Sequence, residues 1–336
     1  MKRLKYFPLL CLVAVVSCHD LPPESKAGDW RGVHFWIDSD TSARELMDTL
    51  PGLAKVGVNT VVMEVNYSFE FQAHPELRSR RFVTVTTAHA LAVAARQNGI
   101  ILIPEFNCLG HQTFGHRLSP LLRAHPDFNE TPSFSATTPG IYCLSWCPRA
   151  PGLNEIVFSL IDEMAAGFEA RYFHVGMDEV YLIGEDECPR CRGAKPADIF
   201  VAQVKALHDH IVKKKGLGML MWADRVVGPK YQGVCQYDDA HNDLSASISS
   251  IPRDIILCDW HYESKPAYPS VPYLAGQGFR VWPASFQPVS AAQAFSDYSW
   301  SNRSGVIGFL ATTWTSVPIS DAPEWPPIKD ILPRWK

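Results

Sequence analysis

Two adjacent carboxylates, Asp178 and Glu179, end an apolar run in the segment RYFHVGMDEV. A carboxylic acid can protonate a leaving oxygen, and a fixed carboxylate beside it can stabilise developing positive charge. If the run is a barrel strand, both acids lie at its C-terminal end, where the catalytic groups of that fold collect. The pair therefore predicts an enzyme.

The rest of the sequence predicts the elements that position this pair. From Arg31 onward, short apolar runs alternate with stretches of helical period, which is typical of repeated βα units. Helices are expected at 43–56, 87–98, 152–170 and 197–215. Strands are expected near 32–36, 60–65, 100–105, 172–177, 218–222, 255–259, 279–284 and 306–312. We predict an α/β protein, a single (β/α)8 TIM barrel spanning 29–336, with imperfect closure because prolines leave only 328–332 for a last helix.

The residues just past these strands form one predicted rim, in which carboxylates and aromatic residues dominate. A flat indole suits the CH face of a sugar ring as well as it suits a core. A polar rim can also arise simply because strands end where the chain meets water, and buried tryptophans are often only packing. Besides the acid pair, the candidates for substrate contact are Glu105, His111, Trp222, Asp224, Tyr262, Trp282 and Trp314.

The N-terminus predicts export. Residues 1–17 pair a basic start with a short apolar run, and Val15-Val16-Ser17-Cys18 resembles a bacterial lipobox. We expect a signal peptide at 1–17, a lipidated Cys18 and a protein of the cell envelope, at the periplasm or outer membrane. The alternative is an ordinary secretory signal with an incidental cysteine. No later segment of the sequence is apolar enough to span a bilayer, so the lipid would be the only membrane contact.

The charge of the sequence does not indicate a particular binding partner. The formal net charge is −4, and basic and acidic residues are interspersed, so the sequence carries no nucleic-acid footprint.

Several segments resemble one known family. HVGMDEV is similar to the H-x-G-G-D-E signature of family 20 glycoside hydrolases, the β-N-acetylhexosaminidases, and FHVGMDEVYLIGE resembles the hexosaminidase D members more closely. RGVHFWID, IPEFNCLGH, LMWAD and TTWTS resemble the family's first, third, fifth and eighth strands in the expected order. The resemblance covers nearly the whole mature chain and implies a member that consists of the barrel alone. Met177 departs from the signature and adds bulk beside Asp178.

This resemblance implies an exo-acting, retaining, substrate-assisted enzyme that removes terminal GlcNAc or GalNAc from glycans or glycosaminoglycan fragments. Glu179 would be the general acid and then the base, and Asp178 would orient the substrate's acetamido group and stabilise the oxazolinium intermediate. Arg31 matches the family's first-strand arginine, whose forked donors can bind two ring hydroxyls. His111 matches its Gly-His motif, Tyr262 its carbonyl-binding tyrosine, and Trp222, Trp282 and Trp314 its pocket walls. No cofactor is implied for catalysis.

Four cysteines form two closely spaced pairs, Cys143 with Cys147 and Cys188 with Cys191, on loops expected at one barrel face. Such pairs are typical of a structural zinc site. Export favours disulfides instead, because oxidising compartments promote them. Both possibilities stay open, and neither makes the cysteines catalytic.

A second class of function also stays open. The same barrel could be a carbohydrate-binding lipoprotein that captures amino sugars with little or no hydrolysis. The intact Asp178-Glu179 pair favours the enzyme.

Overall fold

The computed structural model describes residues 30–114, 116–135, 137–139, 143–227 and 242–335. The predicted signal peptide at 1–17 and the predicted lipid attachment at Cys18 lie outside the described residues. Within the described ranges, no helix has both the length and the apolar character needed to cross a bilayer.

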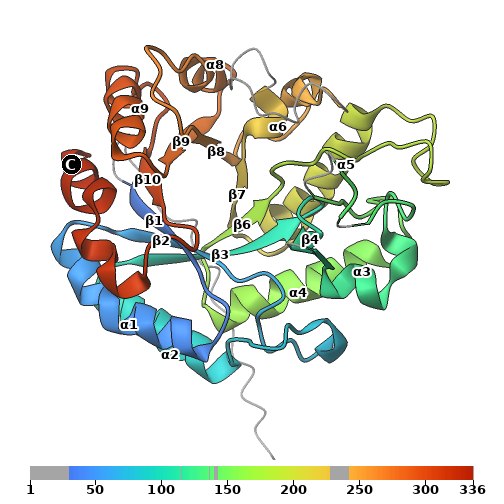
Figure 1. The fold of residues 1–336 in the computed structure, drawn as a ribbon, viewed down its shortest axis with the longest axis horizontal. Helices are drawn as coiled ribbons and strands as arrows, with labels where there is room; N and C mark the ends of the chain where they lie inside the picture. Colours follow the sequence, from blue (N-terminus) through green and yellow to red (C-terminus); the bar gives the residue numbers. More distant parts are fainter. Residues whose placement is uncertain (1–29, 115, 136, 140–142, 228–241, 336) are drawn as a thin grey trace, which may run out of the picture.

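Eight parallel strands close into a barrel in the order β1-β10-β9-β8-β7-β6-β3-β2 (Figure 1). Every predicted strand overlaps an observed one, which confirms the (β/α)8 barrel. The strands are β1 (Trp30–Trp36), β2 (Thr60–Glu64), β3 (Ile101–Cys108), β6 (Tyr172–Gly176), β7 (Gly218–Trp222), β8 (Ile256–Trp260), β9 (Arg280–Ser285) and β10 (Gly308–Thr312).

Helices surround the strands on the outside of the barrel (Figure 1). They are α1 (Asp40–Lys55), α2 (Val85–Gln97), α3 (Pro120–Ala124), α4 (Leu153–Gly167), α5 (Pro196–His208), α6 (Asp224–Val227), α8 (Ser270–Gly276) and α9 (Val289–Ser301). The connection from β3 to α4 is long and carries the hairpin of β4 (Thr113–Phe114) and β5 (Arg117–Leu118) as well as α3.

Local capping fixes where the first two helices begin. Ser39 caps α1, and its side chain exchanges hydrogen bonds with Ser42 in a capping box. Thr84 caps α2 by accepting a hydrogen bond from the backbone N–H of Thr87. Ser39 lies three residues past β1, and the Thr84 N–H donates to Asp40 Oδ1 (2.8 Å), so the two helix starts are linked.

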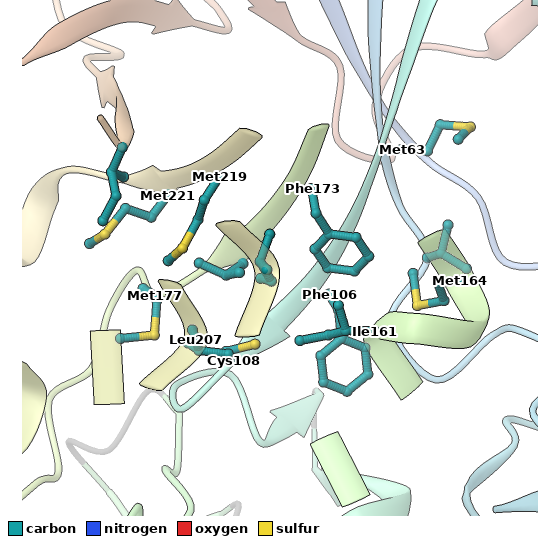
Figure 2. Packing of buried hydrophobic residues seen from close by; sticks show 14 of the residues in the cluster. Met63, Phe106, Cys108, Ile161, Met164, Phe173, Met177, Leu207, Met219 and Met221 are labelled. Atoms are coloured by element: carbon teal, nitrogen blue, oxygen red, sulfur yellow. The ribbon is translucent and has the colours of Figure 1, made fainter. Parts of the chain in front are cut away.

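Two apolar layers hold the barrel together. The outer layer packs strand side chains against helices, as Met221 and Phe173 pack with Leu207 and Met164 in one buried cluster (Figure 2). The inner layer fills the barrel itself, where Trp30 meets Tyr172 and Trp282 edge-on with ring centroids 4.9 Å apart. Among the described residues, this inner cluster fills the lower half of the barrel, and the pocket described below lies toward the strand ends.

The expected imperfect closure is wrong. β1 pairs with β10 from Trp30 opposite Gly308 through His34 opposite Thr312. The prolines do restrict the last segment to short turns at Ile319–Glu324, Pro327–Ile331 and Leu332–Arg334. Trp335 nevertheless anchors that segment, because it is buried and its Nε1 donates to Ser296 Oγ on α9 (2.9 Å). Side-chain packing replaces the missing helix.

Candidate active site

The acid pair follows a tight turn at the end of β6. Gly176, Met177 and Glu179 all have positive φ angles, of 64°, 72° and 49°. A side chain at Gly176 would place its Cβ 2.3 Å from Asn107 Oδ1, so only glycine fits there. A left-handed backbone at ordinary residues costs about 1–3 kcal/mol each and persists only where the surroundings impose it.

Met177 points away from the pocket. Its side chain is buried in the outer apolar layer, in the same cluster as Leu207 and Met221 (Figure 2). The departure from the signature therefore adds bulk to the core behind Asp178, and Met177 is not among the residues that line the pocket.

His111 joins the two carboxylates. Its Nε2 lies 3.1 Å from Asp178 Oδ2 and 3.1 Å from Glu179 Oε2. Gly110 makes this approach possible, because a Cβ there would lie 2.6 Å from the carbonyl oxygen of Asp178. Burial alone would lower the pKa of His111, but the neighbouring charges, Asp178 foremost, raise it well above its usual value. The imidazolium form thus faces both acids.

Glu179 is held from three further directions. Its backbone N–H donates to Asp224 Oδ2 (2.8 Å), and its carbonyl accepts a hydrogen bond from the Cys143 thiol (3.1 Å). The Tyr181 hydroxyl donates to Glu179 Oε1 (3.2 Å). Sequence reasoning missed Tyr181, although its position two residues after Glu179 was visible.

The prediction that Asp224 contacts substrate is wrong. Asp224 is buried and does not line the pocket, because it lies behind the backbone of Glu179. Burial, followed by the charge of Asp178, raises the pKa of Asp224 well above its usual value. Asp224 therefore positions the backbone of Glu179.

Asp178 offers one unused acceptor. Burial raises the pKa of Asp178, and the charge of His111 opposes that effect. Its Oδ1 is buried and receives no hydrogen bond from any residue in the described ranges. A buried carboxylate oxygen without a donor is costly unless a ligand supplies one. Asp178 is therefore suited to accept an N–H from a bound molecule.

A pocket of about 1420 Å³ opens above the acid pair at the strand ends. His111, Asp178 and Glu179 line it, as do the predicted aromatic residues Trp222, Tyr262 and Trp314. Burial raises the pKa of Tyr262, which keeps its phenol a hydrogen-bond donor. Aromatic lining that the prediction did not select comes from Trp36, Trp260 and Phe286. Trp36 could have been found from strand alternation, because it shares the inward phase of His34.

Glu105 lies below the pocket, where it holds a wall residue. It accepts a hydrogen bond from Trp222 Nε1 (2.8 Å), and its carboxylate lies 3.3 Å from His34 Nε2 and 3.1 Å from His174 Nδ1. Burial acts to raise the pKa of Glu105, but His174 and His34 hold it below its usual range. The predicted substrate contact of Glu105 is wrong, because its side chain is 1% exposed and does not line the pocket.

Comparison with known proteins decides the family. Residues 32–318 match the model described as the glycosyl hydrolase family 20 catalytic domain. The chain belongs to this family.

Individual relatives are distant. The family 20 chain is 22% identical over 303 residues to a β-hexosaminidase of Vibrio furnissii, a match that covers 88% of this chain and 45% of the relative. It is 28% identical over 147 residues to hexosaminidase D of Bos taurus, covering 43% of this chain and 39% of that protein. The chain thus spans less than half the length of these curated relatives.

Solved structures share the fold. The Flavobacterium johnsoniae chitobiase superposes with a TM-score of 0.66 at 20% identity, over 91% of this chain and 48% of the chitobiase. A Vibrio harveyi exo-β-N-acetylglucosaminidase in complex with N-acetylglucosamine gives the same TM-score at 16% identity, over 91% of this chain and 54% of that one.

Two other predicted substrate residues of the family 20 chain lie elsewhere. Arg31 lies near the start of β1, at the end of the barrel opposite the pocket, where its guanidinium donates to the carbonyls of Gly57 (2.5 Å) and Trp335 (3.1 Å). Trp282 points into the barrel but is paired in register with Cys258, two residues below the pocket residue Trp260. The predicted sugar contacts of both residues are wrong.

The four predicted cysteines do not form one cluster. Cys143 contacts Glu179, whereas Cys147, Cys188 and Cys191 converge with Glu130. The six cysteines within the described ranges are unbridged, so none of the predicted disulfides is present there. Sequence reasoning missed Glu130, because no spacing rule links it to a cysteine pair.

Proposed function

We propose that this family 20 protein is an exo-acting β-N-acetylhexosaminidase with a retaining, substrate-assisted mechanism. The observation that carries the proposal is the arrangement of the acid pair. Asp178 and Glu179 are neighbours on one strand end and both converge on His111 Nε2. They therefore occupy one wall of the pocket and cannot flank a sugar from opposite faces as an ordinary acid and nucleophile do.

In the proposed reaction the substrate supplies its own nucleophile. The carbonyl oxygen of its 2-acetamido group attacks the anomeric carbon while Glu179 protonates the departing glycosidic oxygen. Asp178 Oδ1 accepts the acetamido N–H, which orients the carbonyl and stabilises the positive charge of the cyclic oxazolinium. Glu179 then removes a proton from water, whose oxygen attacks the same carbon and reopens the ring. Two inversions leave the anomeric configuration unchanged.

The remaining pocket residues support this chemistry. Trp222 and Trp314 provide indole faces for the sugar and its acetamido methyl, and the Tyr262 phenol can donate to the reacting carbonyl. His111 and Tyr181 fix the two oxygens of Glu179. No protein nucleophile is needed.

Arginines at the mouth of the pocket favour anionic glycans, such as glycosaminoglycan fragments, among the substrates. Four exposed arginines line this region, and Arg81 pairs with Asp38 at 3.2 Å. Guanidinium groups bind carboxylates and sulfates through paired hydrogen bonds. The four are Arg80, Arg81, Arg117 and Arg123.

The test compares aryl β-N-acetylglucosaminide and β-N-acetylgalactosaminide with the plain β-glucoside and β-galactoside. We expect turnover of the N-acetylated pair only. Glu179→Gln should lower kcat by about 10²–10⁴-fold, because general acid catalysis contributes that much. Glu155→Gln, an exposed change on α4, is the matched control and should retain full activity.

Two results would contradict the proposal. Equal cleavage of the plain glycosides would exclude assistance by the acetamido group. Tight amino-sugar binding without turnover by the wild type would identify a carbohydrate-binding protein on the same barrel.

For its location we propose export and attachment to the cell envelope through lipid on Cys18. The support is the basic and apolar start of the sequence followed by Val15-Val16-Ser17-Cys18. In bacterial cells, labelled fatty acid should be incorporated into the wild type and absent from Cys18→Ser. Equal labelling of both would overturn the proposal.

A further inference from the structure

Three sulfurs and one carboxylate converge outside the catalytic pocket. Cys147 Sγ lies 3.4 Å from Cys188 Sγ and 3.5 Å from Cys191 Sγ. These sulfurs and one carboxylate oxygen of Glu130 all lie within 4.8 Å of one another, and all four residues are buried. Zinc–sulfur bonds of about 2.3 Å in a tetrahedron place sulfurs roughly 3.8 Å apart, so the observed spacing is close to that of a zinc site.

Glu130 has the features of an oriented ligand. Its Oε1 accepts backbone hydrogen bonds from Gly184 (2.8 Å) and Glu185 (3.2 Å). Its Oε2 is buried and receives no hydrogen bond from the residues that the structure describes. One oxygen is thus fixed by the backbone while the other faces a partner that hydrogen bonding does not provide. Metal-binding carboxylates are commonly held in this way.

A positive side chain adjoins the sulfurs. Arg190 Nε donates to Cys147 Sγ at 3.4 Å. Three thiolates and a carboxylate carry four negative charges, of which Zn²⁺ neutralises two. A guanidinium donor to one sulfur reduces the remaining charge in this buried region.

A disulfide would use only two of the three sulfurs. Cys147 is within reach of both other sulfurs, so any pairing leaves the third cysteine and the Glu130 carboxylate outside the bond. A tetrahedral metal uses all four groups. We propose that Glu130, Cys147, Cys188 and Cys191 bind one structural Zn²⁺.

The four proposed ligands come from two loops that also carry active-site residues. Glu130 and Cys147 belong to the connection between β3 and α4, which also carries His111 and Cys143. Cys188 and Cys191 belong to the β6–α5 loop, which also carries the acid pair. Zinc would therefore fasten together the two loops that meet at Glu179. Its loss should loosen both loops without removing any catalytic side chain.

The test measures metal directly. The full chain, purified without chelator or added metal, should contain one zinc per chain by inductively coupled plasma mass spectrometry. Removal of zinc should release three thiols to a mercurial reagent. Replacement by Co²⁺ in the wild type should give the visible bands of tetrahedral cobalt and a sulfur-to-metal charge-transfer band. None of these readouts depends on hydrolytic activity.

Variants locate the ligands. Cys191→Ser should purify with less than one zinc. Glu130→Gln preserves the shape and both backbone contacts of Oε1, and it should bind zinc at least about 10-fold more weakly in chelator competition. Cys143→Ser is the matched control and should keep one zinc, because its sulfur contacts Glu179 instead. A wild-type chain that binds no zinc, with its thiols bridged or free, overturns the proposal. Equal zinc loss from Cys143→Ser overturns the ligand set.

Discussion

The charge of His111 should set how acidic the medium can become before activity is lost. The acid pair raises the pKa of His111, which favours the imidazolium form. Its Nε2 lies 3.1 Å from Asp178 Oδ2. Asp178 must be ionised to stabilise the oxazolinium in the proposed mechanism. Removing the positive charge favours the neutral form of Asp178, so the pKa of Asp178 rises further in a variant such as His111→Asn. Asparagine also tolerates the φ of 53° at this position.

Coulomb's law gives the size of the effect. Unit charges 3.1 Å apart interact by about 1.3 kcal/mol at a dielectric constant of about 80, and by about 5 kcal/mol at about 20. One pKa unit corresponds to about 1.4 kcal/mol. The side chains are partly exposed, at 21% for His111 and 13% for Asp178, so the true value lies between these limits. The acid limb of kcat/KM should therefore move up by about one pH unit or more.

The assay is kcat/KM for an aryl β-N-acetylglucosaminide measured from acid to neutral pH in wild type and His111→Asn. The control is His89→Asn on α2. The His89 side chain is 63% exposed and pairs with Glu169, and neither residue lines the pocket. That profile should match the wild type. An acid limb at the same pH in His111→Asn, with reduced activity throughout, would show that His111 acts by shape alone and would refute the electrostatic reasoning.

Three further changes test the supporting structure. Asp224→Ala removes the acceptor of the Glu179 N–H, so kcat should fall about 10–100-fold with little change in KM; wild-type kcat would contradict this. Arg31→Ala should lower the free energy of unfolding by about 1–3 kcal/mol and leave KM unchanged, whereas a raised KM at unchanged melting temperature would restore the sugar-binding role. Burial lowers the pKa of His34, but its hydrogen bonds to the carboxylates of Glu105 and Glu64 outweigh that effect and raise it to about 9. Its stabilising contribution is full below pH 6.5 and lost as the pH rises through 9, so the cost of His34→Gln in urea unfolding should shrink by about 3 kcal/mol between pH 6 and pH 10. A pH-independent cost would exclude an ionised His34.

Sequence periodicity was sufficient for the barrel because each strand and helix carries its own local signal. The acid pair was likewise predictable, since adjacency at a strand end needs no knowledge of distant contacts. The prediction that Arg31 binds sugar failed because motif matching ignores which way a strand residue faces. Trp30, Gly32 and His34 occupy the inner side of β1, so Arg31 between them faces outward.

Depth and long-range contacts account for the remaining errors. Whether a tryptophan reaches the pocket depends on strand register, which puts Trp282 one layer below Trp260. Asp224 and Glu130 act through contacts with segments far away in the chain, at Glu179 and at the cysteine cluster. Such contacts arise from how loops meet above the barrel. No local pattern in a single sequence encodes them.

The packed rings of Trp30, Tyr172 and Trp282 block the barrel axis at the end opposite the pocket. A sugar freed at the strand ends has no passage along the barrel axis and must return to solvent past the place that its aglycone occupied. Shape thus imposes an order of departure in the proposed reaction: the aglycone leaves first and the monosaccharide last. Accumulating amino sugar, the last product to leave, is then the species that competes with fresh substrate for the empty enzyme.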